Sequence, residues 1–260
     1  MHRIFTWATI LCIASGCNLS SLEDTVVVSD VADEFYLDIW ESLTAQGRFL
    51  EFRLRTIADE PCLNATIDCD FQQTNRDLSI SIKEIVREEG CEEGEAPATA
   101  NIRVNSSLPG GYYPFFVDLR EKVTTEGQLV ITSGAYNISL DEGGGIVLLR
   151  PELLRIPDGT IWGYIAYEDG GLEAAADEFI SSLRSISKGR TLREGYFGYF
   201  TVDSEGVLKF SNTVAPSGAL TFSYEYDGDP ETLVNLLQEY RTEYGPGLQV
   251  KLWNTLGDEF

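Results

Sequence analysis

Histidine is the scarcest informative residue in this chain of 260 amino acids, because the only one is His2. Histidine is the usual general base beside a serine or cysteine nucleophile, and a common zinc ligand. The chain also has no G-x-S-x-G elbow, no P-loop and no G-x-G-x-x-G turn after a predicted strand. His2 falls in a leader that we expect to be removed, so histidine-dependent catalysis and histidine-bound zinc are excluded.

Basic residues are also few. Lys and Arg total 19 against 42 Asp and Glu, which gives a formal net charge of -23. A nucleic-acid partner is excluded, since phosphate binding needs a surplus of basic side chains. Hydrophobic residues make up 43% of the chain and aromatics 11%, which is too much for a disordered acidic tail. The chain is therefore expected to fold, as one large domain or two small ones.

The N-terminal apolar run is short. Residues 4–14 follow Arg3, and the run falls well below the about 20 residues that span a bilayer. A basic start, a short apolar stretch and small residues are typical of a secretory signal peptide. Residues 14–17 read Ala-Ser-Gly-Cys and resemble the lipobox of bacterial lipoproteins, with Ala14 where Leu is usual. The resemblance implies cleavage before Cys17 and a lipid on its thiol; cleavage without lipid is the alternative.

A polar tether follows the cysteine and ends in the acidic pair Glu23-Asp24. It resembles the export signals that carry some Gram-negative lipoproteins to the outer face of the outer membrane. Thr25 follows Asp24 as in the Asp-Thr-apolar acceptor for O-glycans in some of these bacteria, so it is a candidate glycosylation site. We expect a lipid-anchored protein at the cell surface, with the periplasmic face as the alternative. Acyl chains would hold it, because an acidic protein is repelled by anionic membranes.

The cysteines predict a disulfide. Cys12 and Cys17 belong to the leader and the lipobox, which leaves Cys62, Cys69 and Cys91. Export leads to an oxidising compartment, where three thiols allow three pairings with one left over. We favour Cys62 with Cys91, because these two lie just outside two predicted strands. The tight loop from Cys62 to Cys69 remains open.

Alternating apolar and polar residues predict strands through residues 31–150. Within residues 48–56, Leu50, Phe52 and Leu54 alternate with charged residues, as in a half-buried strand. Comparable patterns, separated mostly by Gly-rich turns, cover residues 78–86, 102–104, 112–119, 128–132, 136–140 and 146–149. This spacing favours an antiparallel β-sandwich. Residues 31–43 fit either a helix or an edge strand.

From residue 151 onward the pattern predicts an α/β domain. A strand over residues 160–167 is followed by apolar residues at helical spacing from Leu172 to Ile186. Asp229 fits the N-cap of a second helix, with Pro230 in the first position. Further strands are expected at residues 196–202, 207–210, 219–226 and 248–253. The order β-α-β-β-α-β resembles the ferredoxin-like fold by pattern only, so no functional residue follows from it.

Aromatic clusters supply the candidate ligand-binding residues. Tyr113, Tyr196 and Tyr199 lie in strands with aromatics on both faces, so these rings could stack on sugars or contact a partner protein. Core packing gives the same pattern and is the favoured alternative. Three tryptophans are expected first as buried anchors: Trp40, Trp162 and Trp253.

Acidic residues supply weaker candidates. A Glu-rich run over residues 84–95 lacks the alternating ligands of a calcium loop and fits a solvated surface. Residues 227–231 resemble the start of an EF-hand loop, but Thr232 and Gln238 replace its Gly and Glu, so capping explains them better. Asp203 and Glu205 could act as a carboxylate pair on a glycosidic bond, although turns commonly carry acids. No metal or cofactor is expected.

The sequence therefore predicts an α+β protein with a defined order of segments. Residues 1–16 form the signal peptide, 17–30 the lipidated linker, 31–150 the β-sandwich and 151–260 the ferredoxin-like domain. Its expected role is a non-catalytic binding or assembly module that is held at the membrane by lipid and contacts a protein or glycan partner. A carbohydrate-binding accessory lipoprotein is the first alternative, and a carboxylate-based hydrolase is the second.

Overall fold

The computed structural model describes residues 31–87, 90–104, 108–167, 170–211, 213, 215–216 and 218–260. The chain divides into two units, residues 1–30 and residues 31–260. Cys17 and Thr25 lie outside the described residues, together with the predicted signal peptide and tether. Within the described part, the second unit is mixed α+β and consists mostly of strands with two α-helices. The predicted fold class is confirmed at this level.

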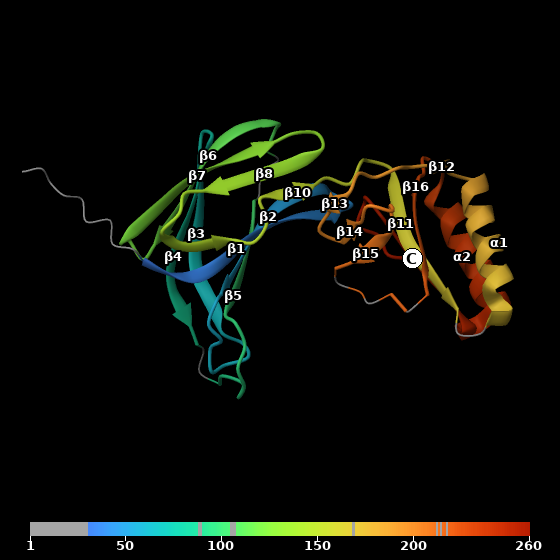
Figure 1. Cartoon of the computed structure of the whole chain (residues 1–260), viewed down its shortest axis with the longest axis horizontal. Helices are drawn as coiled ribbons and strands as arrows, with labels where there is room; N and C mark the ends of the chain where they lie inside the picture. The colour runs from blue at the N-terminus through green and yellow to red at the C-terminus, as the bar shows by residue number, and fades with distance from the viewer. Residues whose placement is uncertain are drawn as a thin grey trace, which may run out of the picture. The chain divides into compact units, whose positions relative to one another are not determined.

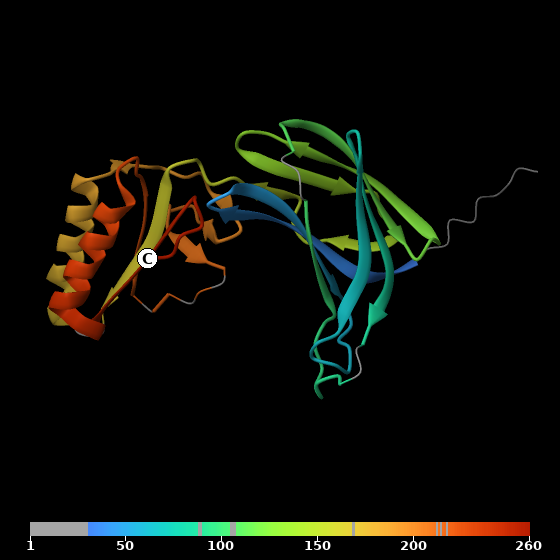
Figure 2. The ribbon, with the colours of Figure 1, turned by 180° about the vertical axis from the view of Figure 1, so that it is seen from behind.

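Ten strands form one large sheet, drawn from blue to yellow-green in Figures 1 and 2. Their spatial order is β10-β8-β7-β6-β4-β3-β5-β2-β1-β9. Residues 31–43 belong to a strand, which pairs antiparallel with β2 and parallel with β9. The bounds are β1 (Val31–Thr44), β2 (Gly47–Thr56), β3 (Thr66–Thr74), β4 (Asp77–Val86), β5 (Thr99–Arg103), β6 (Gly111–Leu119), β7 (Val123–Ile131), β8 (Ala135–Leu140), β9 (Gly144–Leu148) and β10 (Glu152–Leu154).

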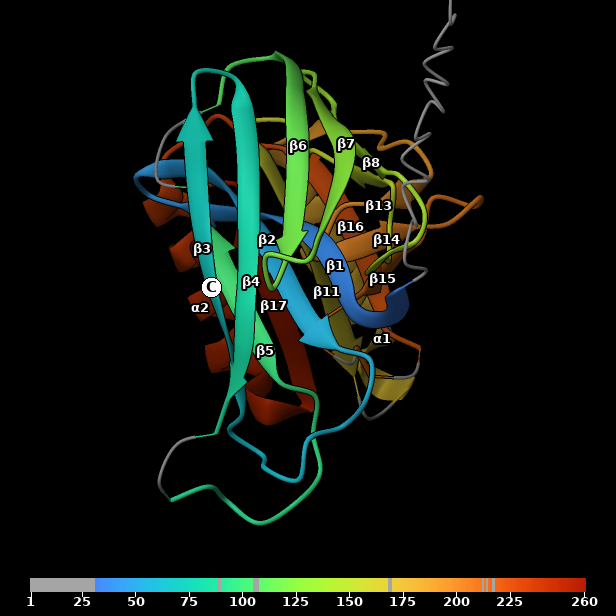
Figure 3. The same ribbon diagram turned by 90° about the vertical axis from the view of Figure 1, so that its left-hand side faces the viewer.

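The large sheet curls, and its two parts enclose one core. β3 and β5 are joined by a single residue pair, Thr66 with Thr99, so the ladder is nearly interrupted there. Figure 3 shows β3, β4 and β6 lying across from β5, β2 and β1. The rings of Phe52 on β2 and Phe115 on β6 stack with their centroids 4.9 Å apart. Side chains from both parts therefore meet in one hydrophobic cluster.

The disulfide prediction is confirmed. Cys62 and Cys91 are bonded, with Cα atoms 5.5 Å apart, and they lie in the loops that follow β2 and β4. Of the three cysteines in the described part of the chain, Cys69 is free and lies half-buried on β3. The disulfide thus ties together the two loops at one end of the curled sheet, and the alternative pairing of Cys62 with Cys69 is wrong.

The C-terminal part contains a four-stranded sheet of order β12-β16-β11-β17 with antiparallel neighbours. Both α-helices lie on one face of it (Figure 1), and their apolar sides form a cluster with Ile161 and Leu252. The Asp229 carboxylate accepts from the N–H of Glu231 at 2.9 Å, so the predicted helix cap is confirmed. The bounds are β11 (Thr160–Tyr167), η1 (Gly170–Leu172), α1 (Glu173–Ser185), β12 (Lys188–Gly189), β16 (Leu220–Glu225), α2 (Pro230–Tyr244), η2 (Gly245–Gly247) and β17 (Leu248–Asn254).

The strand predicted over residues 196–202 is broken. It forms β13 (Gly195–Tyr196) and β14 (Phe200–Val202), which pair with each other and, through β14, with β15 (Leu208–Phe210). Gly198 has a φ of +82°, and the N–H of Phe197 donates to the carbonyl of Phe200 at 2.8 Å. The alternating residues predict one continuous strand, but a turn at Gly198 divides it into the two paired strands of a tight hairpin.

Candidate binding face

Tyr113 lies in the core, so the favoured explanation of core packing holds for it and it is not available as a ligand-binding residue. Its side chain is 2% exposed, within the core of the curled sheet, and its hydroxyl donates to the Pro109 carbonyl at 2.7 Å. Alternation along β6 places Tyr113 and Phe115 on the buried side and leaves Tyr112 51% exposed. The alternation continues to Val117 and Leu119, with Asp118 on the opposite side, so the sequence already contained the signal that places Tyr113 on the core side.

Tyr196 and Tyr199 come together on the outer face of β1. The Tyr199 ring lies 4.9 Å from that of Trp40, and its hydroxyl accepts from the N–H of Leu43 at 3.0 Å. Gly198 lets the hairpin approach, because a Cβ there would lie 3.3 Å from the Trp40 ring. Both tyrosines are half-buried, and burial raises the pKa of each.

The register of β1 and β2 shows which side chains share this outer face. Tyr36 pairs with Arg55, Asp38 with Arg53, and Trp40 with Glu51. Their neighbours in sequence, such as Leu37 and Phe52, point into the core. We call the outward set the Arg–aromatic face; it comprises Tyr36, Asp38, Trp40, Phe49, Glu51, Arg53, Arg55, Asn101, Arg103, Arg150, Tyr196 and Tyr199.

Four guanidinium groups on this face lie over aromatic rings. Each contact is worth about 0.5–1 kcal/mol at an exposed site, and more where water is excluded. The stacks hold flat cationic groups against the sheet in fixed orientations. The distances from Cζ to the ring centroid are 3.7 Å for Arg103 over Phe49, 3.9 Å for Arg53 over Trp40, 4.1 Å for Arg150 over Tyr196 and 4.8 Å for Arg55 over Tyr36.

Only two of these arginines have a carboxylate partner in the described part of the chain. Arg53 Nη2 lies 3.3 Å from Glu51 Oε2, and Arg150 pairs with Asp38. Burial raises the pKa of the Asp38 carboxyl, and the Arg150 guanidinium opposes that rise. Arg55 and Arg103 are exposed and contact no acid among the described side chains. The Arg–aromatic face thus carries four positive charges and two negative charges.

These arginines were not among the candidate binding residues that the sequence analysis identified, although the sequence contains a pattern that indicates two of them. The alternation through residues 48–56 places Arg53 and Arg55 on one side of a strand. With a net charge of -23, two basic residues on one outward face are an unusual local reversal. Arg103 joins them only through the pairing of β5 with β2, which no local pattern specifies.

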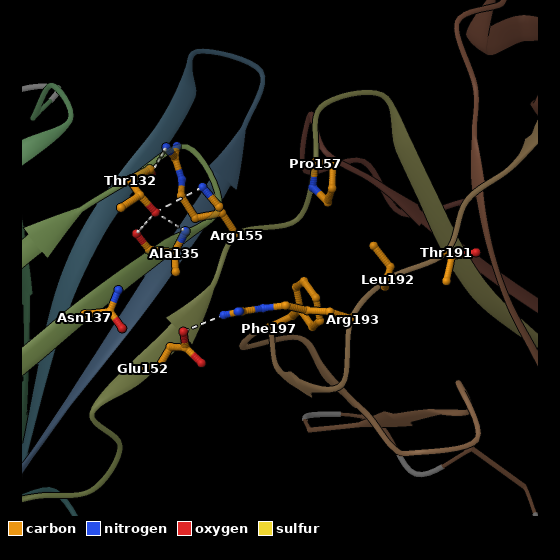
Figure 4. A pocket seen from close by; sticks show the side chains of 11 residues that line it. Thr132, Ala135, Asn137, Glu152, Arg155, Pro157, Thr191, Leu192, Arg193 and Phe197 are labelled. Carbon is orange, nitrogen blue, oxygen red and sulfur yellow. Dashed lines mark hydrogen bonds and ion pairs between the residues drawn. The ribbon is translucent and has the colours of Figure 1, made fainter.

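A second candidate is a pocket of about 420 Å³ near Phe197 (Figure 4). Arg155 points along its wall, with Nε 2.9 Å from Glu41 Oε1 and Nη1 3.3 Å from the Thr132 carbonyl. Arg193 and Glu152 point toward each other and form an ion pair. Every charged group along the described lining is therefore already paired, and the pocket has no surplus charge to attract a ligand.

The acidic candidates do not form a reactive site. The Asp203 carboxylate accepts from the N–H groups of Glu205 and Val207, each at 3.0 Å. The Val207 bond, followed by the contact with Lys209, lowers the pKa of Asp203. Asp203 therefore holds its own turn closed. Glu88 and Glu89 of the acidic run lie outside the described residues. Among the residues that the structure does describe, no group of three His, Cys, Asp or Glu side chains is placed to hold a metal ion.

Comparison with known proteins adds no relative. No family model matches the chain, and no curated protein or solved structure is significantly similar to it. The Arg–aromatic face, which unites two of the three predicted tyrosines, is therefore the feature on which a functional proposal rests.

Proposed function

We propose that the protein is a lipid-anchored outer-membrane lipoprotein that acts as a non-catalytic binding module. The Arg–aromatic face carries this proposal, because it gathers oriented cationic groups on one side of an otherwise strongly acidic protein. Arginine presents several donors in a rigid plane and suits recognition of anionic groups. The proposed location is the cell surface, where such a face is accessible to external ligands.

The anchoring part of the proposal rests on the Ala-Ser-Gly-Cys sequence that ends at Cys17 and on the polar tether after it. In the described part of the chain, no helix is both long and apolar enough to cross a membrane. Lipid on the Cys17 thiol would supply the attachment.

Cys17→Ala is expected to move the protein from the membrane fraction to the soluble fraction. Loss of the thiol removes the site of acylation, and the remaining acidic surface is repelled by anionic lipid. Fractionation with palmitate labelling measures the effect, and Cys69→Ala is the matched control because that cysteine is free within the folded part. Retention of the Cys17→Ala variant in membranes contradicts lipid anchoring. Protease treatment of intact cells then distinguishes surface display from the periplasmic face.

We also propose a finer description of the fold. A β-sandwich over residues 31–150 is supported by the single pair that links β3 to β5 and by the shared core of the two parts. Its pairing is mixed and not purely antiparallel as predicted, because β1 with β9 and β4 with β6 are parallel. A ferredoxin-like arrangement over residues 158–258 is supported by the strand order β12-β16-β11-β17 with both helices on one face. In this arrangement β13, β14 and β15 are an insertion before β16.

The binding role is tested with soluble protein that starts at Asp24. Wild-type protein is expected to bind isolated cell envelopes, and the Arg55→Glu/Arg103→Glu variant is expected to lose roughly tenfold or more in affinity, since charge-assisted contacts become repulsions. Arg76→Glu/Lys122→Glu is the matched control, with the same change in charge at exposed hairpin turns that contribute no residue to the face. Equal loss in both variants would show that net charge, and not this face, governs binding.

Carbohydrate binding remains the second candidate, and one observation favours it. The face carries the side-chain amide of Asn101 between exposed arginines, and such planar polar groups can bond to the hydroxyls of a sugar. The carboxylate-based hydrolase has no comparable support, because Glu152 is the one acid along the described pocket lining and it is paired with Arg193.

A further inference from the structure

We infer that the Arg–aromatic face binds an acidic linear polysaccharide, with Arg55 and Arg103 holding its carboxylate groups. This inference rests on the proposed binding function and names its ligand class. Three observations support it: which groups of the face a ligand can reach, the distance between the arginines without a carboxylate partner, and the backbone pairing of the strands that carry them.

The open planes of the face are guanidinium groups and not aromatic rings. A neutral sugar stacks on a free ring, but the rings of Tyr36, Trp40 and Phe49 are each covered by an arginine. An approaching ligand therefore meets the arginines first. A carboxylate can accept two parallel hydrogen bonds from such a plane without displacing it from the ring.

The unpaired charges are spaced for an extended ligand. Arg55 pairs with Thr99 and Arg103 pairs with Glu51, so the strand rise of about 3.4 Å per residue places the two arginines roughly 13 Å apart along the strands. Asn101 lies between them on β5 and pairs with Arg53. A single small anion cannot contact both ends of this row, whereas a chain of sugars with repeating carboxylates can, and its hydroxyls can bond to the Asn101 amide.

The backbone of the face argues against an acidic peptide as the ligand. β2 is paired with β1 on one side and β5 on the other, and β1 is paired with β2 and β9. A peptide usually binds a sheet by adding a strand to a free edge. Here β1 and β2 have partners on both sides, so a peptide lying over Arg55 would have only its side chains to use, whereas a polysaccharide binds through peripheral groups in any case. β5 is joined to β3 at Thr99 alone, so addition of a peptide strand to β5 is one of the outcomes that the poly-glutamate probe distinguishes.

Isothermal titration of the protein that starts at Asp24 tests the inference with three probes. Polygalacturonate carries repeating carboxylates on sugars, dextran is a neutral polysaccharide, and poly-glutamate is an acidic peptide. We expect wild-type protein to bind polygalacturonate at least about tenfold more tightly than the other two, with affinity falling as salt rises because the contacts are ionic.

The variants then locate the site. Arg55→Glu/Arg103→Glu is expected to weaken polygalacturonate binding roughly tenfold or more, while Arg76→Glu/Lys122→Glu stays within about threefold of wild type. Both pairs are exposed, so unchanged circular dichroism and melting temperature confirm folding. Equal binding of dextran overturns the acidic class, equal binding of poly-glutamate overturns the sugar, and no binding of polygalacturonate overturns the inference. Envelope binding that still depends on Arg55 and Arg103 then leaves the proposed binding function intact.

Discussion

Glu41→Gln is expected to lower the free energy of unfolding by about 2–4 kcal/mol, since removing one partner of a buried ion pair leaves the others uncompensated. Glu41 is 4% exposed. Its carboxylate accepts from Arg48 Nη1 at 2.8 Å, from Arg155 Nε at 2.9 Å and from the Tyr136 hydroxyl at 2.8 Å. Burial, followed by the Glu41 charge, raises the pKa of Tyr136, so the tyrosine stays a donor. Glutamine keeps the shape and removes the charge.

Urea denaturation measures this loss, and Glu51→Gln is the matched control. Glu51 contacts one arginine at 3.3 Å and lies closer to solvent, so its loss is expected to cost about 1 kcal/mol or less. The estimate for Glu41 is below the full cost of a buried charge because Arg48 and Arg155 retain some contact with water. A change below about 0.5 kcal/mol for Glu41→Gln would show that the carboxylate does not stabilise the fold.

Trp162→Ala is expected to destabilise the protein by about 3–5 kcal/mol, the range for deleting a large buried aromatic side chain. Trp162 is 1% exposed at the middle of β11. Its ring centroid lies 5.7 Å from that of Tyr199 and 5.6 Å from that of Phe200. Alanine would leave a cavity among aromatic rings that cannot rotate freely to fill it.

Thermal and urea unfolding measure the effect of Trp162→Ala. Trp162→Phe retains most of the apolar volume and is expected to cost less than half as much. Trp253→Ala is the second control, since that ring is half-buried and pairs with Trp162 across the strands. If Trp253→Ala were as damaging as Trp162→Ala, depth of burial would not explain the contribution of Trp162.

Local sequence patterns predicted many of the helices, strands and turns. They failed where contacts between residues far apart in the sequence determine the structure. The helix that starts after Asp229 and the disulfide between Cys62 and Cys91 follow from capping and spacing, and both are confirmed. Residues 31–43 fit a helix as well as a strand because Phe35, Ile39 and Leu43 recur at helical spacing. The aromatic rings of Tyr36 and Trp40 on the outer side also hide the alternation of the strand. The break at Gly198 depends on the approach to Trp40, which lies far away in the sequence.

The candidate site was likewise predicted only in part. Tyr196 and Tyr199 were identified as candidates, but the arginines that define their surroundings were not. Arg103 and Arg150 come from separate parts of the chain and reach Phe49 and Tyr196 only in the folded structure. A sequence shows which rings and charges exist, whereas their stacking depends on strand order that local residues do not encode.

The parallel pairing of β1 with β9 also constrains the order in which the chain folds. Val31 pairs with Gly144 and Leu37 with Leu148, and the Arg155 partner of Glu41 lies further still along the chain. Contacts between such distant residues form slowly, since a long loop must close before they are gained. β1 and β2 can pair early as a hairpin, whereas the parallel edge of β1 and the Glu41 network are completed only once Leu148 and Arg155 have been made.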